Sequence, residues 1–299
     1  MNLPKNIQIT EVCPRDGFQN HKTWIETELK KEIIDDLCAL GFKKMEISSF
    51  VSPKVIPQMR DAGEIIGYFN KKWGDRVEGI SLIPNLKGAE LALQAGAESL
   101  IMVISASNDH NLANTGRTVE NSLKELAEIC KIKGGAKLSL GVGTAFMCPF
   151  AGEIDAKKVV EIIDASLALD VSHITIADTT GTGSPLKVHN TLSEVRKIFP
   201  YTSFALHFHD TYGFGLANVL TSMRLGFNSF ESSVASMGGC PFAPGATGNL
   251  ATEDLVNMAE GMGIETGIDL LNLLKVTRRI SKKLQLQSNS HIAATQLGL

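Results

Sequence analysis

Residues 39–47 read A-L-G-F-K-K-M-E-I, where a helix-like segment stops at a glycine and an apolar, strand-like segment follows. Glycine at this place fits the left-handed backbone that commonly ends a helix. The pattern recurs as Q-A-G-A-E-S-L-I-M at 94–102, A-L-D-V-S-H-I-T-I at 168–176 and R-L-G-F-N-S-F-E-S at 224–232. The repeat predicts alternating helices and strands, with helices that end at Gly41, Gly96, Asp170 and Gly226.

Apolar segments rich in β-branched residues recur along the whole chain. We predict eight strands, at 7–12, 43–50, 77–84, 99–107, 137–146, 173–179, 203–210 and 229–235. The segments between them show helical periodicity, as in the stripes Leu29, Ile33, Ile34, Leu37, Leu40 and Val159, Ile162, Ile163, Leu167. Eight strand–helix units predict an α/β protein with a (β/α)8 TIM barrel. The competing open, doubly wound sheet usually carries G-x-G-x-x-G after an early strand, and this sequence has no such motif.

Length and composition favour one large domain. The chain has 299 residues, of which 43% are hydrophobic and 20% charged, so it can bury a single sizeable core. We expect residues 1–284 to form a catalytic barrel. The serine- and asparagine-containing segment 285–299 is expected to be a short C-terminal extension that folds over the barrel or frays.

Charge and hydropathy restrict the partners. A net charge of −3 gives no overall basic field for nucleic acid, and no apolar run approaches the length of a membrane span. The first strand begins within a few residues of Met1, so we expect no leader sequence and a cytoplasmic location. The five cysteines have no disulfide-scaffold spacing, which suits a reducing compartment.

In a TIM barrel the active site lies where the strands end, so polar residues at those positions are candidates for function. The sequence C-P-R-D-G-F-Q-N follows the first strand and places Arg15, Asp16 and Gln19 at this rim. The second strand contains Glu46 and ends in Ser48 and Ser49, and the sixth ends at Asp178. Asp178 alone could cap the next helix. Convergence of this many polar groups from several strands instead favours an active site.

The segment S-F-A-L-H-F-H-D at 203–210 carries two histidines two positions apart. On a strand, His207 and His209 project to the same face. Two imidazoles leave coordination positions for oxygen ligands, which Asp16 and Asn249 can supply if the barrel brings them to the same rim. A pair of core-facing histidines without a metal is the alternative.

The segment S-V-A-S-M-G-G-C-P-F-A-P-G-A-T-G-N at 233–249 places Cys240 in a loop rich in glycine and proline. Gly238 and Gly239 permit backbone angles that are closed to other residues, and the prolines stiffen the second half of the loop. Such a loop can hold a reactive thiol over a pocket. A lone cysteine in a strand-to-helix connection can equally be an inert small apolar residue.

These motifs resemble the 3-hydroxy-3-methylglutaryl-CoA lyase family over nearly the whole chain. The matching segments are V-C-P-R-D-G-F-Q-N at 12–20, M-E-I-S-S-F-V-S-P-K at 45–54, A-D-T-T-G at 177–181, H-F-H-D-T-Y-G at 207–213 and S-V-A-S-M-G-G-C-P-F at 233–242. The resemblance implies that Asp16, His207, His209 and Asn249 bind one Mg²⁺ or Mn²⁺ ion. It also implies a catalytic set of Arg15, Glu46, Asp178 and Cys240, an acyl-CoA substrate contacted by Arg15 and Gln19, and a homodimer.

The reaction that the resemblance implies is cleavage of the substrate to acetyl-CoA and acetoacetate. A proton must leave the C3 hydroxyl and another must reach the enolate carbon, so Asp178 and Cys240 are the candidate base and acid, in an order that the sequence leaves open. Arg15 can stabilise the charge that develops on the thioester oxygen. Glu46 is expected to hold Arg15 or a proton network.

Two other functions remain possible on the same barrel. A condensing enzyme would make a 2-alkylmalate from acetyl-CoA and a 2-oxo acid, but such enzymes usually carry a further C-terminal region and have no need of a G-G-C-P loop. A non-catalytic metal- or acyl-CoA-binding barrel would bind tightly without turnover.

Overall fold

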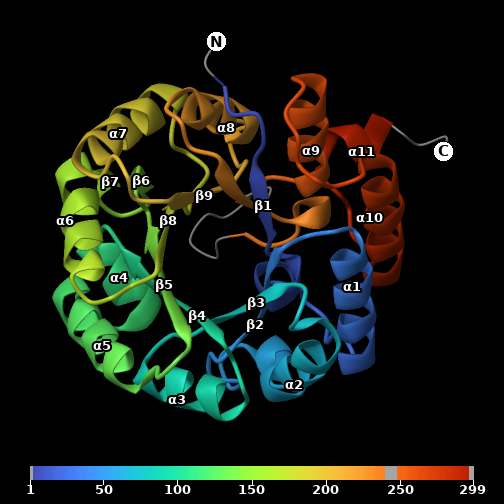
Figure 1. The fold of residues 1–299 in the computed structure, drawn as a ribbon, viewed down its shortest axis with the longest axis horizontal. Helices are drawn as coiled ribbons and strands as arrows, with labels where there is room; N and C mark the ends of the chain where they lie inside the picture. Colours follow the sequence, from blue (N-terminus) through green and yellow to red (C-terminus); the bar gives the residue numbers. More distant parts are fainter. Residues whose placement is uncertain (1–2, 240–247, 296–299) are drawn as a thin grey trace.

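The computed structural model describes residues 3–239 and 248–295. Its centre is a closed barrel of parallel strands in the order β1-β10-β9-β8-β5-β4-β3-β2, surrounded by helices (Figure 1). These strands are β1 (Gln8–Glu11), β2 (Lys44–Ser49), β3 (Glu78–Leu82), β4 (Ser99–Ser105), β5 (Lys137–Gly143), β8 (His173–Asp178), β9 (Phe204–Phe208) and β10 (Ser229–Ser232). The predicted (β/α)8 TIM barrel is confirmed, and every predicted strand segment contains one of its strands.

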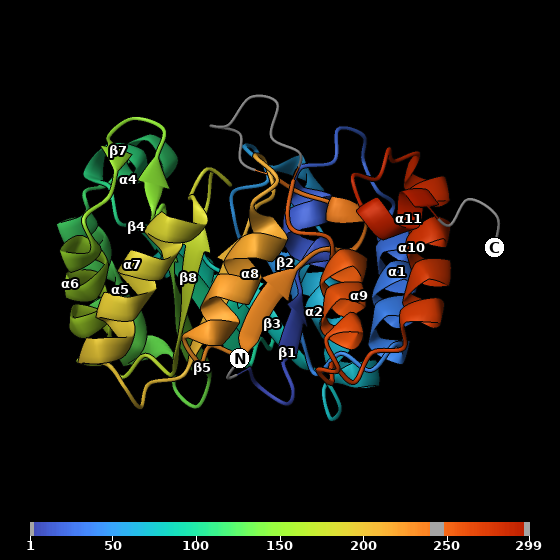
Figure 2. The ribbon, with the colours of Figure 1, turned by 90° about the horizontal axis from the view of Figure 1, so that it is seen from above.

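The helices lie outside the barrel, as the side view in Figure 2 shows. They are α1 (Thr27–Ala39), α2 (Ala62–Trp73), α3 (Leu86–Gln94), α4 (Asn108–Thr115), α5 (Val119–Ile132), α6 (Ala156–Leu167), α7 (Pro185–Ile198), α8 (Gly215–Arg224), α9 (Thr252–Gly261), α10 (Leu270–Leu284) and α11 (His291–Thr295). An antiparallel hairpin of β6 (Met147–Cys148) and β7 (Gly152–Glu153) follows β5. The sequence patterns did not predict this hairpin.

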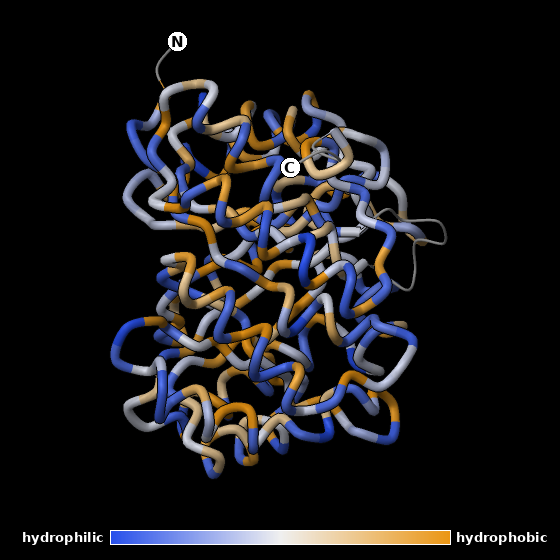
Figure 3. Tube along the Cα trace, turned by 90° about the vertical axis from the view of Figure 1, so that its right-hand side faces the viewer, coloured by the Kyte–Doolittle hydropathy of each residue, from blue (hydrophilic) through white to orange (hydrophobic). Residues whose placement is uncertain are grey.

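Burial of apolar side chains between strands and helices holds these layers together. The stripe of α1 buries Ile33, Ile34 and Leu37, and that of α6 buries Val159 and Ile162. Apolar and polar segments alternate along the chain in Figure 3, as expected for elements that each turn one face to a core. In the described part of the chain, no helix is both long and apolar enough to cross a bilayer.

The repeated helix ends adopt the backbone that the sequence predicts. Gly41, Gly96 and Gly226 have φ values of 100°, 87° and 82°, and Asp170 has φ 60°. Each residue turns the chain from a helix into the following strand. The four repeats therefore mark real helix-to-strand junctions.

Several strands end earlier than predicted, because residues at the barrel mouth leave the sheet. Ser107 is the N-cap of α4, where its side chain accepts a hydrogen bond from the His110 N–H. Thr144 and Ala235 have φ values of 49° and 57°, which a regular strand cannot accommodate. These departures occur at the ends of strands that face the candidate site.

The segment that follows α10 folds back onto α9. The carboxylate of Asp254 accepts hydrogen bonds from the Ser290 hydroxyl and from the backbone N–H groups of His291 and Ile292. A carboxylate at the start of a helix satisfies donors that have no partner within that helix. Asp254 thereby fixes α11 against the barrel.

Candidate active site

The first part of the site comes from β1, which continues into a short π-helix, η1 (Cys13–Gly17). The Asp16 N–H donates to the Val12 carbonyl at 2.8 Å, and the Val12 N–H donates to Ser232 on the neighbouring strand at 2.9 Å. The Phe18 N–H also donates to the Cys13 carbonyl five residues earlier, which makes the turn wider than an α-helix, and such turns occur frequently at functional sites. Here the turn places Arg15 and Asp16 at the C-terminal mouth of the barrel.

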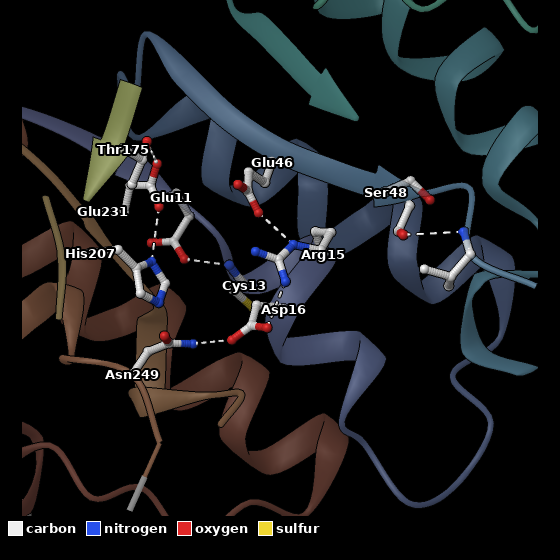
Figure 4. Close-up of polar contacts among 12 residues, drawn as sticks. Glu11, Cys13, Arg15, Asp16, Glu46, Ser48, Thr175, His207, Glu231 and Asn249 are labelled. Atoms are coloured by element: carbon white, nitrogen blue, oxygen red, sulfur yellow. Dashed lines mark hydrogen bonds and ion pairs between the residues drawn. The ribbon is translucent and has the colours of Figure 1, made fainter. Parts of the chain in front are cut away.

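Arg15 is held between two carboxylates. Its Nε donates to Glu46 Oε2 at 2.5 Å, and its Nη1 donates to Asp16 Oδ1 at 2.7 Å (Figure 4). The side chain of Arg15 is only 11% exposed and that of Glu46 2%. Burial opposes the ionisation of Asp16, but the charge of Arg15 and the hydrogen bond from Asn249 help to outweigh it, so the pKa of Asp16 lies below its usual value. The predicted role of Glu46 in holding Arg15 has direct support in this contact.

His207 and His209 lie at the end of β9, both buried, with their Nε2 atoms 3.0 Å apart. Their predicted placement on one face is confirmed. Asn249 forms an isolated bridge with His209, and its Nδ2 donates to Asp16 Oδ2 at 2.6 Å. All four predicted ligands therefore come together at the mouth from β9, the turn after β1 and the chain before α9.

The donor set is suited to a divalent cation. Two ligand atoms at about 2.1 Å from one ion, in perpendicular directions, lie about 3.0 Å apart, which matches the separation of the two Nε2 atoms. Among the described residues, the buried Asn249 Oδ1 has no hydrogen-bond partner. As these side chains stand, no three His, Cys, Asp or Glu residues within 3–239 and 248–295 form a complete metal site. The hydrogen bond between Asn249 and Asp16 uses the amide nitrogen of Asn249 and leaves its amide oxygen free.

The chain passes close to Asp16 and Asn249 at Gly238, and this position requires glycine. Its φ is 101°, and a Cβ atom there would collide with Asp16 Oδ2 and Asn249 Nδ2. The Met237 carbonyl accepts from Asn249 Nδ2 at 2.7 Å just before it. The predicted unusual backbone of Gly238 is confirmed, and Gly239, with φ 151°, shares it.

Asp178 ends β8 with no exposed surface. Its Oδ2 accepts from the Gly183 N–H at 3.0 Å, while Oδ1 has no partner among the described residues. Burial raises the pKa of Asp178 to about 6, although backbone donors of the following turn oppose the shift. Asp178 does not cap the next helix, because Ser184 is the N-cap of α7. A buried carboxylate with one free oxygen and a pKa near neutrality is suited to proton transfer.

The structure gives less support for a function of the remaining predicted site residues. Gln19 is half-buried beside the π-helix, and its Oε1 has no partner within the described residues. Ser48 and Ser49 are buried at the end of β2. Cys240 lies outside the described residues, so its predicted catalytic role stays a prediction.

Two further buried carboxylates lie beneath the mouth, and the sequence patterns did not reveal them. Glu11 Oε1 accepts from the N–H groups of Cys13 and Val234 at 2.9 and 3.1 Å. Glu253 accepts from the Ala235 N–H at 3.2 Å. Burial raises the pKa of Glu11 to about 8 and that of Glu253 to about 7. Both carboxylates accept hydrogen bonds from the turn η3 (Val234–Ser236), which precedes Cys240 in the sequence.

Glu231 is a third buried carboxylate that was not predicted. It lies inside the barrel on β10, where Oε2 contacts His207 Nδ1 at 2.9 Å and Oε1 accepts from Thr175 Oγ1 at 2.8 Å. The signal that could have found Glu11 and Glu231 is a lone acidic residue within an apolar strand, because a buried carboxylate needs specific partners.

Comparisons with known proteins identify relatives of the whole chain. The HMGL-like family model matches residues 6–280. The mitochondrial hydroxymethylglutaryl-CoA lyase of Homo sapiens is 40% identical over 293 residues, covering 97% of this chain and 90% of that protein. The hydroxymethylglutaryl-CoA lyase YngG of Bacillus subtilis is 38% identical over 289 residues, covering 95% of each.

A solved structure of an HMG-CoA lyase from Acinetobacter baumannii, in complex with coenzyme A and 3-methylmalate, superposes with a TM-score of 0.92. It is 40% identical and covers 99% of this chain and 97% of its own. Sequence and fold thus point the same way. The chain belongs to the HMGL-like family and, within it, to the hydroxymethylglutaryl-CoA lyases.

Proposed function

We propose that this chain cleaves 3-hydroxy-3-methylglutaryl-CoA into acetyl-CoA and acetoacetate and that it requires one divalent cation. The observation that carries the proposal is the convergence of Arg15, Asp16, His207, His209 and Asn249 at one barrel mouth, in a chain 40% identical to a hydroxymethylglutaryl-CoA lyase. An acyl-CoA substrate is supported by the related lyase structure that contains coenzyme A.

The cation is Mg²⁺ or Mn²⁺, and Asp16, His207, His209 and Asn249 are its ligands. The spacing of the two imidazole nitrogens, the carboxylate of Asp16 and the free amide oxygen of Asn249 support this assignment. When bound, the ion lowers the pKa of the substrate hydroxyl and orients the substrate carboxylate. His209 is suited to ligation, because burial and the neighbouring His207 lower its pKa to about 3 and keep the ring neutral.

Arg15 stabilises the negative charge that develops on the thioester oxygen as the carbon–carbon bond breaks. The two carboxylates that hold it prevent the long side chain from moving away, so the guanidinium is preorganised before substrate binds. Its buried position strengthens the interaction, because little water screens the charge. Gln19, on the same turn, is a second candidate contact for the substrate.

Asp178 is the base and Cys240 the acid in this proposal. At neutral pH a carboxyl with a pKa of about 6 is mostly ionised and can accept the hydroxyl proton. A thiol is mostly protonated at that pH and can donate to the enolate carbon. The free Oδ1 of Asp178 is the atom that accepts the proton.

We further propose a cytoplasmic homodimer. Sedimentation of the purified protein tests the assembly: a mass of twice 32.2 kDa supports a dimer, and a mass of 32.2 kDa contradicts it.

The experiment that tests the function is a direct assay. Purified protein is incubated with 3-hydroxy-3-methylglutaryl-CoA and Mg²⁺, and acetoacetate is measured. A parallel reaction supplies acetyl-CoA with a 2-oxo acid and measures free coenzyme A. Acetoacetate in the first reaction and no coenzyme A release in the second are expected, whereas the reverse result would identify a condensing enzyme.

A further inference from the structure

Glu231 lies directly behind His207 on the neighbouring strand. The two residues are register partners across β10 and β9, and Glu231 Oε2 contacts His207 Nδ1 at 2.9 Å. The other oxygen, Oε1, accepts from Thr175 Oγ1 on β8 at 2.8 Å. All three side chains are buried, and Figure 4 shows them as one continuous chain from Thr175 to His207.

Packing alone does not account for a carboxylate at this position. Interiors of such barrels are filled mainly by bulky branched apolar residues, and a buried carboxylate is costly unless its oxygens are hydrogen-bonded. Both oxygens of Glu231 have partners, and one of them is a ring nitrogen of His207. The contact therefore acts on the orientation of the imidazole and on which of its nitrogens carries the proton.

The direction of this hydrogen bond determines which ring nitrogen of His207 carries the proton. A carboxylate oxygen accepts, so His207 Nδ1 must donate and its neutral ring carries no proton on Nε2. That unprotonated Nε2 is the atom that lies 3.0 Å from His209 Nε2. Thr175 in turn restricts Glu231, because its hydroxyl occupies the second oxygen.

We propose that Glu231 is a positioning residue that, with Thr175, holds the His207 ring with its proton on Nδ1 and so presets Nε2 for the divalent cation. The inference rests on the metal site of the proposed function. Carboxylate partners of metal-binding histidines commonly change metal affinity by 10–100-fold when they are removed.

The test measures Mn²⁺ binding to metal-free protein by isothermal titration calorimetry. Glu231→Ala is expected to raise the Kd for Mn²⁺ by about 10–100-fold, and Thr175→Val to raise it by a smaller factor. Glu78→Ala is a matched control, because Glu78 borders the same cavity of about 230 Å³ as Thr175 and Glu231 but contacts Lys44, Ser99 and Lys137. Its Kd should stay at the wild-type value.

A second measurement detects which ring nitrogen of His207 is protonated. Nitrogen-15 spectra of histidine-labelled, metal-free protein at alkaline pH, where the ring is neutral, with the His207 signal assigned through His207→Asn, should show the Nδ1–H tautomer in the wild type. Glu231→Ala should convert the ring to a mixture with the Nε2–H tautomer. A residue that only stabilised the fold would leave this ratio unchanged.

The outcomes separate the two proposals. If the wild type binds Mn²⁺ and Glu231→Ala binds it equally well with the same tautomer, the positioning role is overturned and the metal site stands. If the wild type binds no Mn²⁺, both are overturned. If circular dichroism shows that Glu231→Ala is unfolded, Thr175→Val decides, and an unchanged Kd and tautomer in that variant would overturn the inference.

Discussion

The Nε of Arg15 donates to Glu46 Oε2 across 2.5 Å, and both side chains are almost completely shielded from water. Arg15 reaches this position from the π-helix after β1, whereas Glu46 comes from the middle of β2. The pair therefore joins two strands at the point where the substrate is expected. A buried cation held this firmly is available to a developing negative charge without reorganisation.

Replacement of Arg15 by methionine should lower kcat by several orders of magnitude with little change in KM. A charge that acts on the developing enolate contributes mainly in the transition state. Steady-state kinetics with 3-hydroxy-3-methylglutaryl-CoA measure both constants, and Arg76→Met, on the far side of the barrel where Arg76 stacks on Trp73, is the control. A change confined to KM would make Arg15 a substrate anchor instead.

The pH dependence of kcat/KM should show an acidic limb near pH 6. Burial raises the pKa of Asp178 to about 6, and as the base it must be ionised, so activity rises as the pH increases through this value. Asp178→Asn should lose at least about 10²-fold in kcat, and its residual rate should lack the limb. An unchanged limb in Asp178→Asn would assign the ionisation to another group. Asp155→Asn, which alters only the exposed cap of α6, should leave the profile intact.

Cys240→Ser should keep the fold and bind metal normally but lower kcat by roughly 10²-fold or more, because a serine hydroxyl has the wrong pKa for the proton transfer. Alkylation should inactivate the wild type at Cys240, with substrate protecting. Cys38 should stay unmodified until the protein unfolds, since burial raises its thiol pKa to about 12. Near-normal turnover by Cys240→Ser would show that the thiol is structural. Asp178 and a water molecule would then have to perform both proton transfers.

The contribution of Glu11 to the stability of the fold should fall as the pH rises from about 4.5 to about 8. Burial raises the pKa of Glu11 from 4.5 to about 8, so in this range the folded state keeps a proton that the unfolded chain has lost. Each pH unit within this window lowers the free energy of unfolding by about 1.4 kcal/mol for one such group. Glu11→Gln mimics the protonated side chain, and chemical denaturation from pH 5 to 9 should show a shallower decline in this variant. Equal slopes in both proteins would contradict a protonated Glu11.

The sequence predicted the barrel well because its signals are local. Apolar strands and glycines such as Gly41 and Gly226 act within a few residues, and parallel barrel strands bring their C-terminal ends to one mouth whatever the helices between them contain. By the same rule, Asp16 and Asn249, which are 233 positions apart in the sequence, lie at one mouth, where they form a hydrogen bond of 2.6 Å. Candidate ligands could therefore be named without knowledge of the contacts.

Contacts that depend on strand register could not be predicted in this way. The contact between Glu231 and His207 depends on the register of β10 with β9. The hydrogen bond from Val234 to Glu11 depends on the position of the turn η3 relative to β1. The π-helix also has no sequence signature, because it depends on the backbone hydrogen bond from Phe18 to Cys13 that forms after the strand ends. These features belong to the tertiary structure.

Removal and restoration of the metal test most directly whether this chain is a metal-dependent lyase. Acetoacetate formation from 3-hydroxy-3-methylglutaryl-CoA is measured on chelator-treated protein before and after addition of Mg²⁺ or Mn²⁺. His207→Ala and His209→Ala serve as site variants, and His173→Ala and His291→Ala as controls. We expect no activity in chelator, recovery with either ion, and weakened affinity for the metal only in the two site variants. Full turnover in excess chelator, or equal effects of all four histidine substitutions, would contradict the proposed metal site.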